Sequence, residues 1–168
     1  MAVEKKISEL TSKSTELQPL DKLEVSEWNG ATFDTKSILG SGFILHKKVS
    51  IVAADLLTAN SSPINLIDAP GTGKALDIID VLVKFNYGTV AFDGASGTVN
   101  FNVDTATDDY FEYADLLSQT ADSLGFAFGN SNPEKTVENQ EFHLIANNDS
   151  TVGDSTMDIY INYRIITL

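Results

Sequence analysis

The clearest pattern in the chain is an alternation of apolar and polar residues that follows a strong turn. Residues 61–86 read SSPINLIDAPGTGKALDIIDVLVKFN, and the turn Pro-Gly-Thr-Gly occupies residues 70–73 between two apolar runs. After the turn, the odd positions from Ile79 to Phe85 are apolar, whereas Asp80 and Lys84 occupy even positions. This period of two is typical of a strand with one face in a core. We therefore predict that residues 61–86 form the central hairpin of an all-β sandwich.

The same period recurs along the rest of the chain. It is strict in residues 98–103 and 158–166, and residues 93–97, Asp-Gly-Ala-Ser-Gly, predict a hairpin turn. Strands are expected over residues 43–54, 62–68, 75–86, 89–93, 97–103, 124–128, 139–146 and 156–167. Short strands separated by Gly and Asn/Asp turns indicate an antiparallel β-sandwich, jelly-roll-like in type. The expected core contains Ile79, Val81, Val83, Phe85, Val99, Phe101, Val103, Ile159, Ile161, Tyr163 and Ile165.

One segment departs from this period. In residues 105–122, TATDDYFEYADLLSQTAD, side chains recur at helical spacing at Tyr110, Tyr113, Ala114 and Leu117. Thr107 or Asp108 can cap a helix here, and acidic residues follow in its first turn. The segment therefore predicts one short helix between strands.

Residues 1–42 differ in composition and pattern from the rest of the chain. They are expected to form an N-terminal arm ahead of a sandwich domain over residues 43–168. Residues 1–20 are rich in Ser, Thr, Lys and Glu, and Pro19 interrupts any continuous helix. This stretch is too sparse in apolar groups to be stable alone, so we expect an extended segment that orders on a partner. The side chains expected to contact that partner are Ile7, Leu10, Leu17, Leu20 and Trp28.

The second half of the arm predicts a small β-ribbon. Asn29 and Gly30 form the strongest short hairpin signal, and alternating residues flank them. Trp28, the one tryptophan, has two interpretations. It is either the anchor of the ribbon in a core, as most tryptophans are, or a residue of an interface.

Composition narrows the class of protein. A chain of 168 residues can bury a real core, and the absence of cysteine excludes disulfides and thiolate chemistry. No run approaches the roughly 18 apolar residues of a membrane span, and the N-terminus lacks the apolar region of a signal peptide. We therefore expect no membrane association, and synthesis and assembly in the cytoplasm of the producing cell.

The net charge of −13 is unevenly distributed. Residues 1–48 hold seven lysines and seven acidic residues, whereas residues 49–168 hold four basic and seventeen acidic residues. Such a surface repels a phosphate polymer, so nucleic-acid binding is not expected. The charge either keeps the domain soluble or provides a face for a basic partner.

Motifs that resemble catalytic or ligand sites have simpler explanations. Residues 69–75, APGTGKA, lack the first glycine and the hydroxyl of a phosphate-binding loop, and they lead into a strand. His46 and His143 each lie in a strand pattern without further zinc ligands at a suitable spacing. We therefore expect no cofactor, no metal site and no enzymatic activity.

Acidic residues leave two other hypotheses open. Pairs such as Asp77 with Asp80, Asp108 with Asp109 and Glu112 with Asp115 would serve a glycosidase only if two carboxylates faced each other across a cleft. The acidic residues between 147 and 158 could hold calcium, although their spacing differs from an EF-hand and a polar hairpin turn explains them as well.

The order of motifs over residues 55–168 resembles that of small structural proteins encoded among the head and virion genes of tailed bacteriophages. The resemblance lies in LLTANSSPINLIDAPGTGKALDI, VKFNYGTVAF, LLSQTADSLGFAF and ENQEFHLIANNDSTVGDSTMDIYINYRII. It covers about two-thirds of the chain, rests on core and turn residues, and does not include the region before Gly40.

The resemblance implies a non-enzymatic virion protein, either a capsid decoration (cement) protein or another auxiliary head protein. Its partner would be the major capsid protein or another virion protein, bound through the N-terminal arm. A homo-oligomer is expected, and a trimer would suit the local symmetry of a capsid. The alternative is a binding module of a head or tail fibre for carbohydrate or a host receptor, which exposed aromatics at Tyr110, Phe111 and Tyr113 would favour.

Overall fold

The computed structural model describes residues 22–28, 33–39, 44–94, 97–103, 111–129 and 137–168. The chain divides into two compact units, residues 1–45 and 46–168. In the first unit, β1 (Lys22–Trp28) and β2 (Phe33–Leu39) form an antiparallel two-stranded sheet, in which Trp28 is opposite Phe33. These two strands lie on either side of residues 29–32, which contain the predicted turn and lie outside the described residues.

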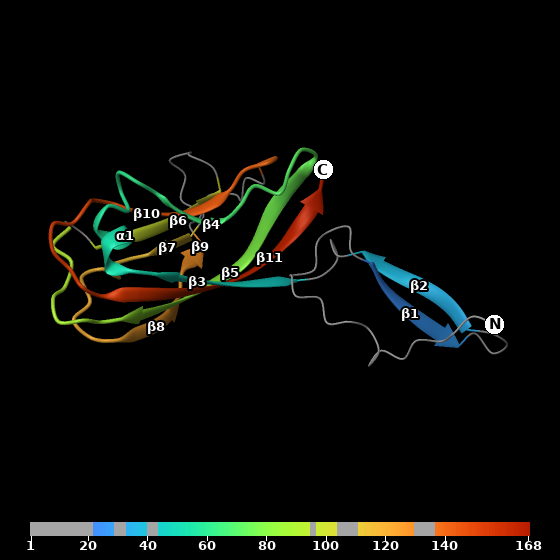
Figure 1. Ribbon diagram of the computed structural model, residues 1–168, viewed down its shortest axis with the longest axis horizontal. Coiled ribbons are helices and arrows are strands. Elements are labelled where there is room, and N and C mark those ends of the chain that lie inside the picture. The colour runs from blue at the N-terminus through green and yellow to red at the C-terminus, as the bar shows by residue number, and fades with distance from the viewer. Residues whose placement is uncertain (1–21, 29–32, 40–43, 95–96, 104–110, 130–136) are drawn as a thin grey trace. The chain divides into compact units, whose positions relative to one another are not determined.

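The remaining strands form the two-sheet, all-β sandwich-like fold that the alternation predicts (Figure 1). The five-stranded sheet has the order β4-β10-β6-β7-β9, and the four-stranded sheet has the order β3-β11-β5-β8. The strands are β3 (Leu45–Ile51), β4 (Ile64–Ile67), β5 (Lys74–Asn86), β6 (Val99–Val103), β7 (Phe111–Tyr113), β8 (Ser123–Phe126), β9 (Phe128–Gly129), β10 (Phe142–Ala146) and β11 (Thr156–Thr167).

The core lies between the two sheets. Alternate residues of β5 and β11, such as Val83 and Ile159, are fully buried, and so are Phe101 of β6 and Phe142 of β10. The rings of Phe101 and Phe142 stack with their centroids 6.2 Å apart. Nine of the eleven predicted core residues are buried, namely Val81, Val83, Phe85, Val99, Phe101, Val103, Ile159, Ile161 and Tyr163.

Ile79, one of the two exceptions, is exposed because β5 contains a β-bulge. Asn162 of β11 is opposite Asp80, but the next residue, Tyr163, is opposite Ile78. Ile79 is thus an extra residue in the ladder, and the bulge reverses which face of the sheet the preceding residues occupy. Ile165 of β11 is the other exception and is half-buried.

The predicted central hairpin at residues 61–86 is wrong, although both of its strands exist. β4 pairs with β10 in one sheet, whereas β5 pairs with β11 and β8 in the other. Residues 68–73 therefore carry the chain from one sheet to the other. A turn signal between two strands cannot distinguish a hairpin from such a crossover, because both need the same backbone reversal.

Residues 89–93 were predicted as a strand with a hairpin turn at 93–97, and the structure contradicts both. The chain from Thr89 to Gly94 is a loop that side chains of other loops hold in place. Residues 95–96 lie outside the described residues.

Among the described residues, the one short helix lies elsewhere than predicted. It is α1 (Ala53–Leu57), which follows β3 directly and buries Leu56 completely. Within the predicted helix of residues 105–122, residues 111–113 form β7 against β6, and Asp115 has a positive φ of 56°. Leu116 and Leu117 are both buried in a turn that follows β7. Residues 105–110 lie outside the described residues.

Within the part of the chain that the structure describes, no helix has the length and the apolar character needed to span a membrane.

Candidate functional site

The face of the four-stranded sheet that points away from the core is the most distinctive surface of the second unit, and we call it the outer face. Alternate residues of neighbouring strands form it in register, because Asp158, Tyr160 and Asn162 of β11 are opposite Lys84, Leu82 and Asp80 of β5. Its residues are His46, Lys48, Ser50, Asp77, Asp80, Leu82, Lys84, Leu124, Phe126, Asp158, Tyr160, Asn162 and Arg164.

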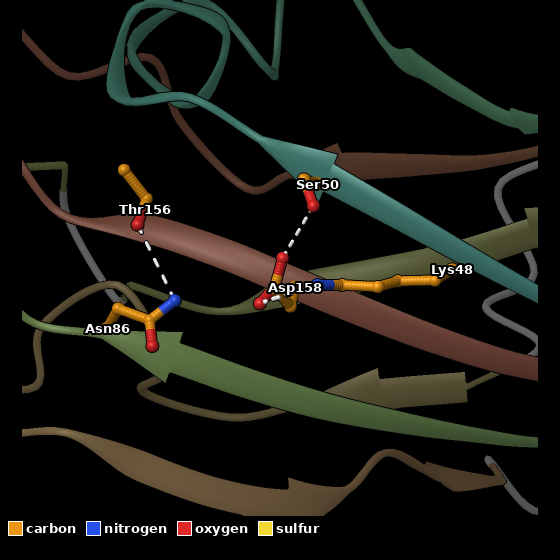
Figure 2. Close-up of polar contacts among 5 residues, drawn as sticks. All are labelled: Lys48, Ser50, Asn86, Thr156 and Asp158. Atoms are coloured by element: carbon orange, nitrogen blue, oxygen red, sulfur yellow. Dashed lines mark hydrogen bonds and ion pairs between the residues drawn. The ribbon is translucent and has the colours of Figure 1, made fainter.

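Asp158 is the centre of a polar cluster on this face (Figure 2). The hydroxyl of Ser50 donates to its Oδ1 at 2.6 Å, and the Nζ of Lys48 lies 3.1 Å from its Oδ2. The hydrogen bond from Ser50 and then the ammonium of Lys48 hold the pKa of Asp158 below its ordinary value. The hydrogen bond to Asp158 in turn raises the pKa of Lys48, so both groups stay charged at neutral pH.

The polar contacts continue along β11 toward its C-terminal end. The Nδ1 of His46 is within hydrogen-bond distance of the Oδ1 of Asn162, and the Nδ2 of Asn162 donates to both carboxylate oxygens of Asp80, at 2.9 and 3.0 Å. Arg164 forms an ion pair with Asp77. Asp77 and Asp80 thus bind separate partners, and they do not form the facing carboxylate pair of a glycosidase.

Large apolar side chains lie beside this polar cluster. The exposed fractions of Leu124 and Phe126 on β8 are 66% and 54%, and that of Tyr160 on β11 is 38%. Leu82 connects them, because it is opposite both Phe126 and Tyr160 in the sheet, and the Nζ of Lys48 lies 5.5 Å from the centre of the Tyr160 ring. The outer face therefore combines an apolar strip with balanced charges, a composition suited to contact with another protein.

Two loops at one end of the sandwich are joined by reciprocal aspartate contacts. Asp154 accepts hydrogen bonds from the backbone N–H groups of Thr89 and Val90, both at 2.8 Å, and from the hydroxyl of Thr89 at 2.6 Å. In the opposite direction, Asp93 accepts from the N–H and the hydroxyl of Thr151 at 2.7 and 2.6 Å. The two loops thereby hold each other without any strand pairing between them.

Asp149 joins a third loop to this end. Its Oδ1 accepts hydrogen bonds from the backbone N–H groups of Asn60 and Ser61, both at 2.9 Å. The calcium hypothesis required the carboxylates between residues 147 and 158 to converge, but Asp149, Asp154 and Asp158 instead bind three different sets of donors. Among the described residues, no group of three or more His, Asp or Glu could hold a metal ion.

These aspartates predict that the fold weakens in acid. Hydrogen bonds from Thr151, Ser61 and Thr89 hold the pKa values of Asp93, Asp149 and Asp154, respectively, below the ordinary 3.8. A depressed pKa contributes stability that is complete above the pKa of the unfolded chain and is lost as pH falls through the lower folded pKa. The free energy of unfolding, measured by urea titration with circular dichroism, should therefore fall as the pH is lowered below about 4.

Asp154→Asn should reduce this pH dependence, because the amide cannot titrate. Asp55→Asn, at an exposed aspartate of α1, is the matched control and should leave the slope of stability against pH closer to that of the wild type. Equal slopes for the wild type and Asp154→Asn would show that Asp154 contributes nothing to acid sensitivity.

The glycine-rich turn before β5 binds protein groups where a phosphate-binding loop would bind a phosphate. The N–H of Gly71 donates to the Oδ1 of Asn139 at 2.9 Å, and the N–H of Gly73 donates to the Oε1 of Glu138 at 2.6 Å. Positive φ angles of 96° and 74° explain why glycine occupies these two positions. The turn leads into a strand, as the sequence predicts.

The two histidines lie in different sheets. His46 is exposed on β3, whereas His143 on β10 is only 3% exposed and is opposite Asn102 of β6. The structure therefore does not bring them together.

The aromatic residues that would favour sugar binding do not form an exposed cluster within the described residues. Phe111 is buried and pairs with Phe101 across β7 and β6, and Tyr113 is half-buried with its hydroxyl close to Gly125. Tyr110 lies outside the described residues. The carbohydrate hypothesis thereby loses the support that it drew from Phe111 and Tyr113.

The predicted partner-binding residues Ile7, Leu10, Leu17 and Leu20 lie outside the described residues. The backbone of Trp28 ends β1, and the placement of its side chain also lies outside them. Contact between these residues and a partner stays a prediction.

Sequence reasoning missed the apolar strip and the aspartate contacts between loops. A signal for the strip was present, because Leu124 and Phe126 alternate with Ser123 and Gly125 and lack any charged neighbour within the strand. The aspartate contacts had a weaker signal, since Asp93 and Asp154 each lie next to a glycine. Nothing in the sequence identifies the loop that each one holds.

Comparisons of the chain with models of protein families, with curated proteins and with solved structures found no match.

Proposed function

We propose that this protein is a non-enzymatic structural protein of a tailed-bacteriophage virion, a capsid decoration or auxiliary head protein. In this proposal it binds the major capsid protein through residues 1–42 and presents the sandwich as a compact body. The observation that carries the assembly role is the outer face, a second contact surface in addition to residues 1–42, where exposed Leu124 and Phe126 adjoin a balanced set of charges. An apolar strip next to paired charges is typical of a surface that contacts other protein.

The structure of the body also supports an assembly role. The Asp93, Asp149 and Asp154 contacts fasten the loops at one end to each other, so the surface there is fixed before any partner binds. A fixed surface loses less conformational entropy on association than a mobile one. The motif order over residues 55–168 supports the same class of protein, because it resembles that of phage virion proteins.

Binding to capsid shells tests the proposal. The full chain should co-sediment with assembled shells of the candidate major capsid protein. A variant with Ile7, Leu10, Leu17 and Leu20 all replaced by serine should lose most of this binding, because each buried apolar side chain contributes roughly 1.5–3 kcal/mol.

The matched control variant carries Ser8→Ala, Ser12→Ala and Thr15→Ala. It changes polar residues of the same segment, keeps the four apolar side chains and should bind like the wild type. Circular dichroism checks that both variants retain the β-sheet signal. The proposal fails if the wild type does not bind shells, and the role of the arm fails if the serine variant binds as tightly as the wild type.

A further inference from the structure

We infer that β8 is a self-association edge, through which two copies of this chain join their four-stranded sheets into one continuous sheet about a twofold axis near Gly125. The inference deepens the proposed function, on which it rests, by naming the surface that makes the protein a homo-oligomer. It differs from the trimer expected from capsid symmetry, because an antiparallel strand pair relates two copies only.

The first observation is the direction of the backbone groups of β8. Ala127 donates its N–H to the carbonyl of Val81 at 2.9 Å, and Gly125 is opposite Val83 in the same ladder. In an antiparallel pair the residues that bond to the partner strand alternate with residues that do not. The N–H and C=O groups of Leu124 and Phe126 therefore point away from β5, toward the outside of the sheet.

The outer side of β8 lies at the end of its sheet. The order β3-β11-β5-β8 places it there, and no described strand pairs with its far side (Figure 1). Proteins protect such edges with lysine, other charges or proline. The opposite edge, β3, carries His46, Lys47 and Lys48, whereas β8 reads Ser-Leu-Gly-Phe and carries no charge.

The second observation is that the same two residues expose their side chains. The exposed fractions of Leu124 and Phe126 are 66% and 54%, and both point to the outer face. When a second β8 pairs antiparallel with Gly125 opposite Gly125, Leu124 of each copy lies opposite Phe126 of the other. Each of these two pairs exchanges two backbone hydrogen bonds and buries an aliphatic group against a ring.

The third observation is the charge of the outer face. It carries three basic residues, Lys48, Lys84 and Arg164, and three acidic residues, Asp77, Asp80 and Asp158, within a chain of net charge −13. Two copies repel each other through most of their surface, but screening over about 8 Å at physiological salt confines that repulsion to nearby charges. In the joined sheet the two outer faces would lie side by side, and their balanced charges would add little net repulsion near the contact. This favours a second copy as the occupant.

The mass of the free protein tests the inference without any capsid, so its failure is distinguishable from failure of the proposed function. Because the paired segment is short, we expect weak association with a dissociation constant of about 1–100 µM, as for small interfaces. Sedimentation equilibrium from about 1 µM to about 1 mM should show a rise from one 18.2 kDa chain to twice that mass.

The double variant Leu124→Lys/Phe126→Lys should stay at the mass of one chain over the same range. Val152→Lys is the matched control, since Val152 is an apolar residue with 47% exposure on a loop, and this variant should associate like the wild type. Phe126→Pro removes one outward N–H while leaving the bonds to β5, and it should also weaken association. Thermal melts confirm that each variant is folded.

A wild type that stays monomeric at the highest concentration, or that forms trimers without dimers, would overturn the inference. Persistence of the dimer in both β8 variants would overturn it as well, because the contact would then lie elsewhere.

Discussion

Phe101→Ala should lower the free energy of unfolding by about 3–5 kcal/mol, the range for removing a buried aromatic ring from a core. Phe101 is fully buried, its ring stacks on that of Phe142, and its backbone pairs with Leu144 on one side and Phe111 on the other. Domains of this size are stable by only about 5–15 kcal/mol, so the variant should unfold at a much lower urea concentration.

Phe126→Ala is the matched control for this prediction, because it makes the same chemical change on a side chain that is 54% exposed. Its free energy of unfolding should stay within about 0.5 kcal/mol of the wild type, as for most surface substitutions. Both values come from urea titrations followed by circular dichroism at a concentration where the protein is monomeric. Equal losses for the two variants would contradict the assignment of Phe101 to the core and Phe126 to the surface.

Gly153→Ala should lower the free energy of unfolding by roughly 2–5 kcal/mol, because it combines backbone strain with a steric clash. Gly153 has a φ of 142°, and a Cβ atom there would lie 2.2 Å from the Cδ1 of Phe92. Phe92 is only 5% exposed, so its ring has little room to move away. The clash should also disturb the reciprocal contacts, since Asp154 follows directly in the chain.

Gly71→Ala separates the two causes. Gly71 also has a positive φ, 96°, but a Cβ atom there would meet nothing within 4 Å. Gly71→Ala should therefore lower the free energy of unfolding through backbone strain alone, by about 1–3 kcal/mol. If urea titration gives the same loss for both variants, the contact between Gly153 and the ring of Phe92 does not limit the substitution.

The strands were predictable where one face of a strand is buried and the other is solvated. Met157, Ile159 and Ile161 alternate with polar or exposed residues because β11 lies in a sheet with only one face in the core. The bulge at Ile79 was not predictable, because isoleucine satisfies the alternation on either face and only the register with Tyr163 decides the outcome.

Local patterns failed where distant contacts decide the structure. The spacing of aromatic and apolar residues in 105–122 predicts a helix, but pairing of Phe111 with Phe101 places residues 111–113 in a sheet. The loop at Thr89 depends on Asp154, 65 residues away in the chain, which no local signal reveals. Of the candidate site, the charged residues of the outer face were visible in the sequence, whereas their arrangement around Asp158 required the register of three strands.

Limited proteolysis with mass analysis tests the central claim, that residues 1–42 bind a capsid shell, most directly. Trypsin cuts after the five lysines of this segment, Lys5, Lys6, Lys13, Lys22 and Lys36, so each rate can be followed in the free protein and in the protein mixed with assembled shells. The account predicts that cleavage at these five sites becomes slower in the presence of shells. Unchanged rates on shells that retain the protein would contradict it and would place the contact on the sandwich.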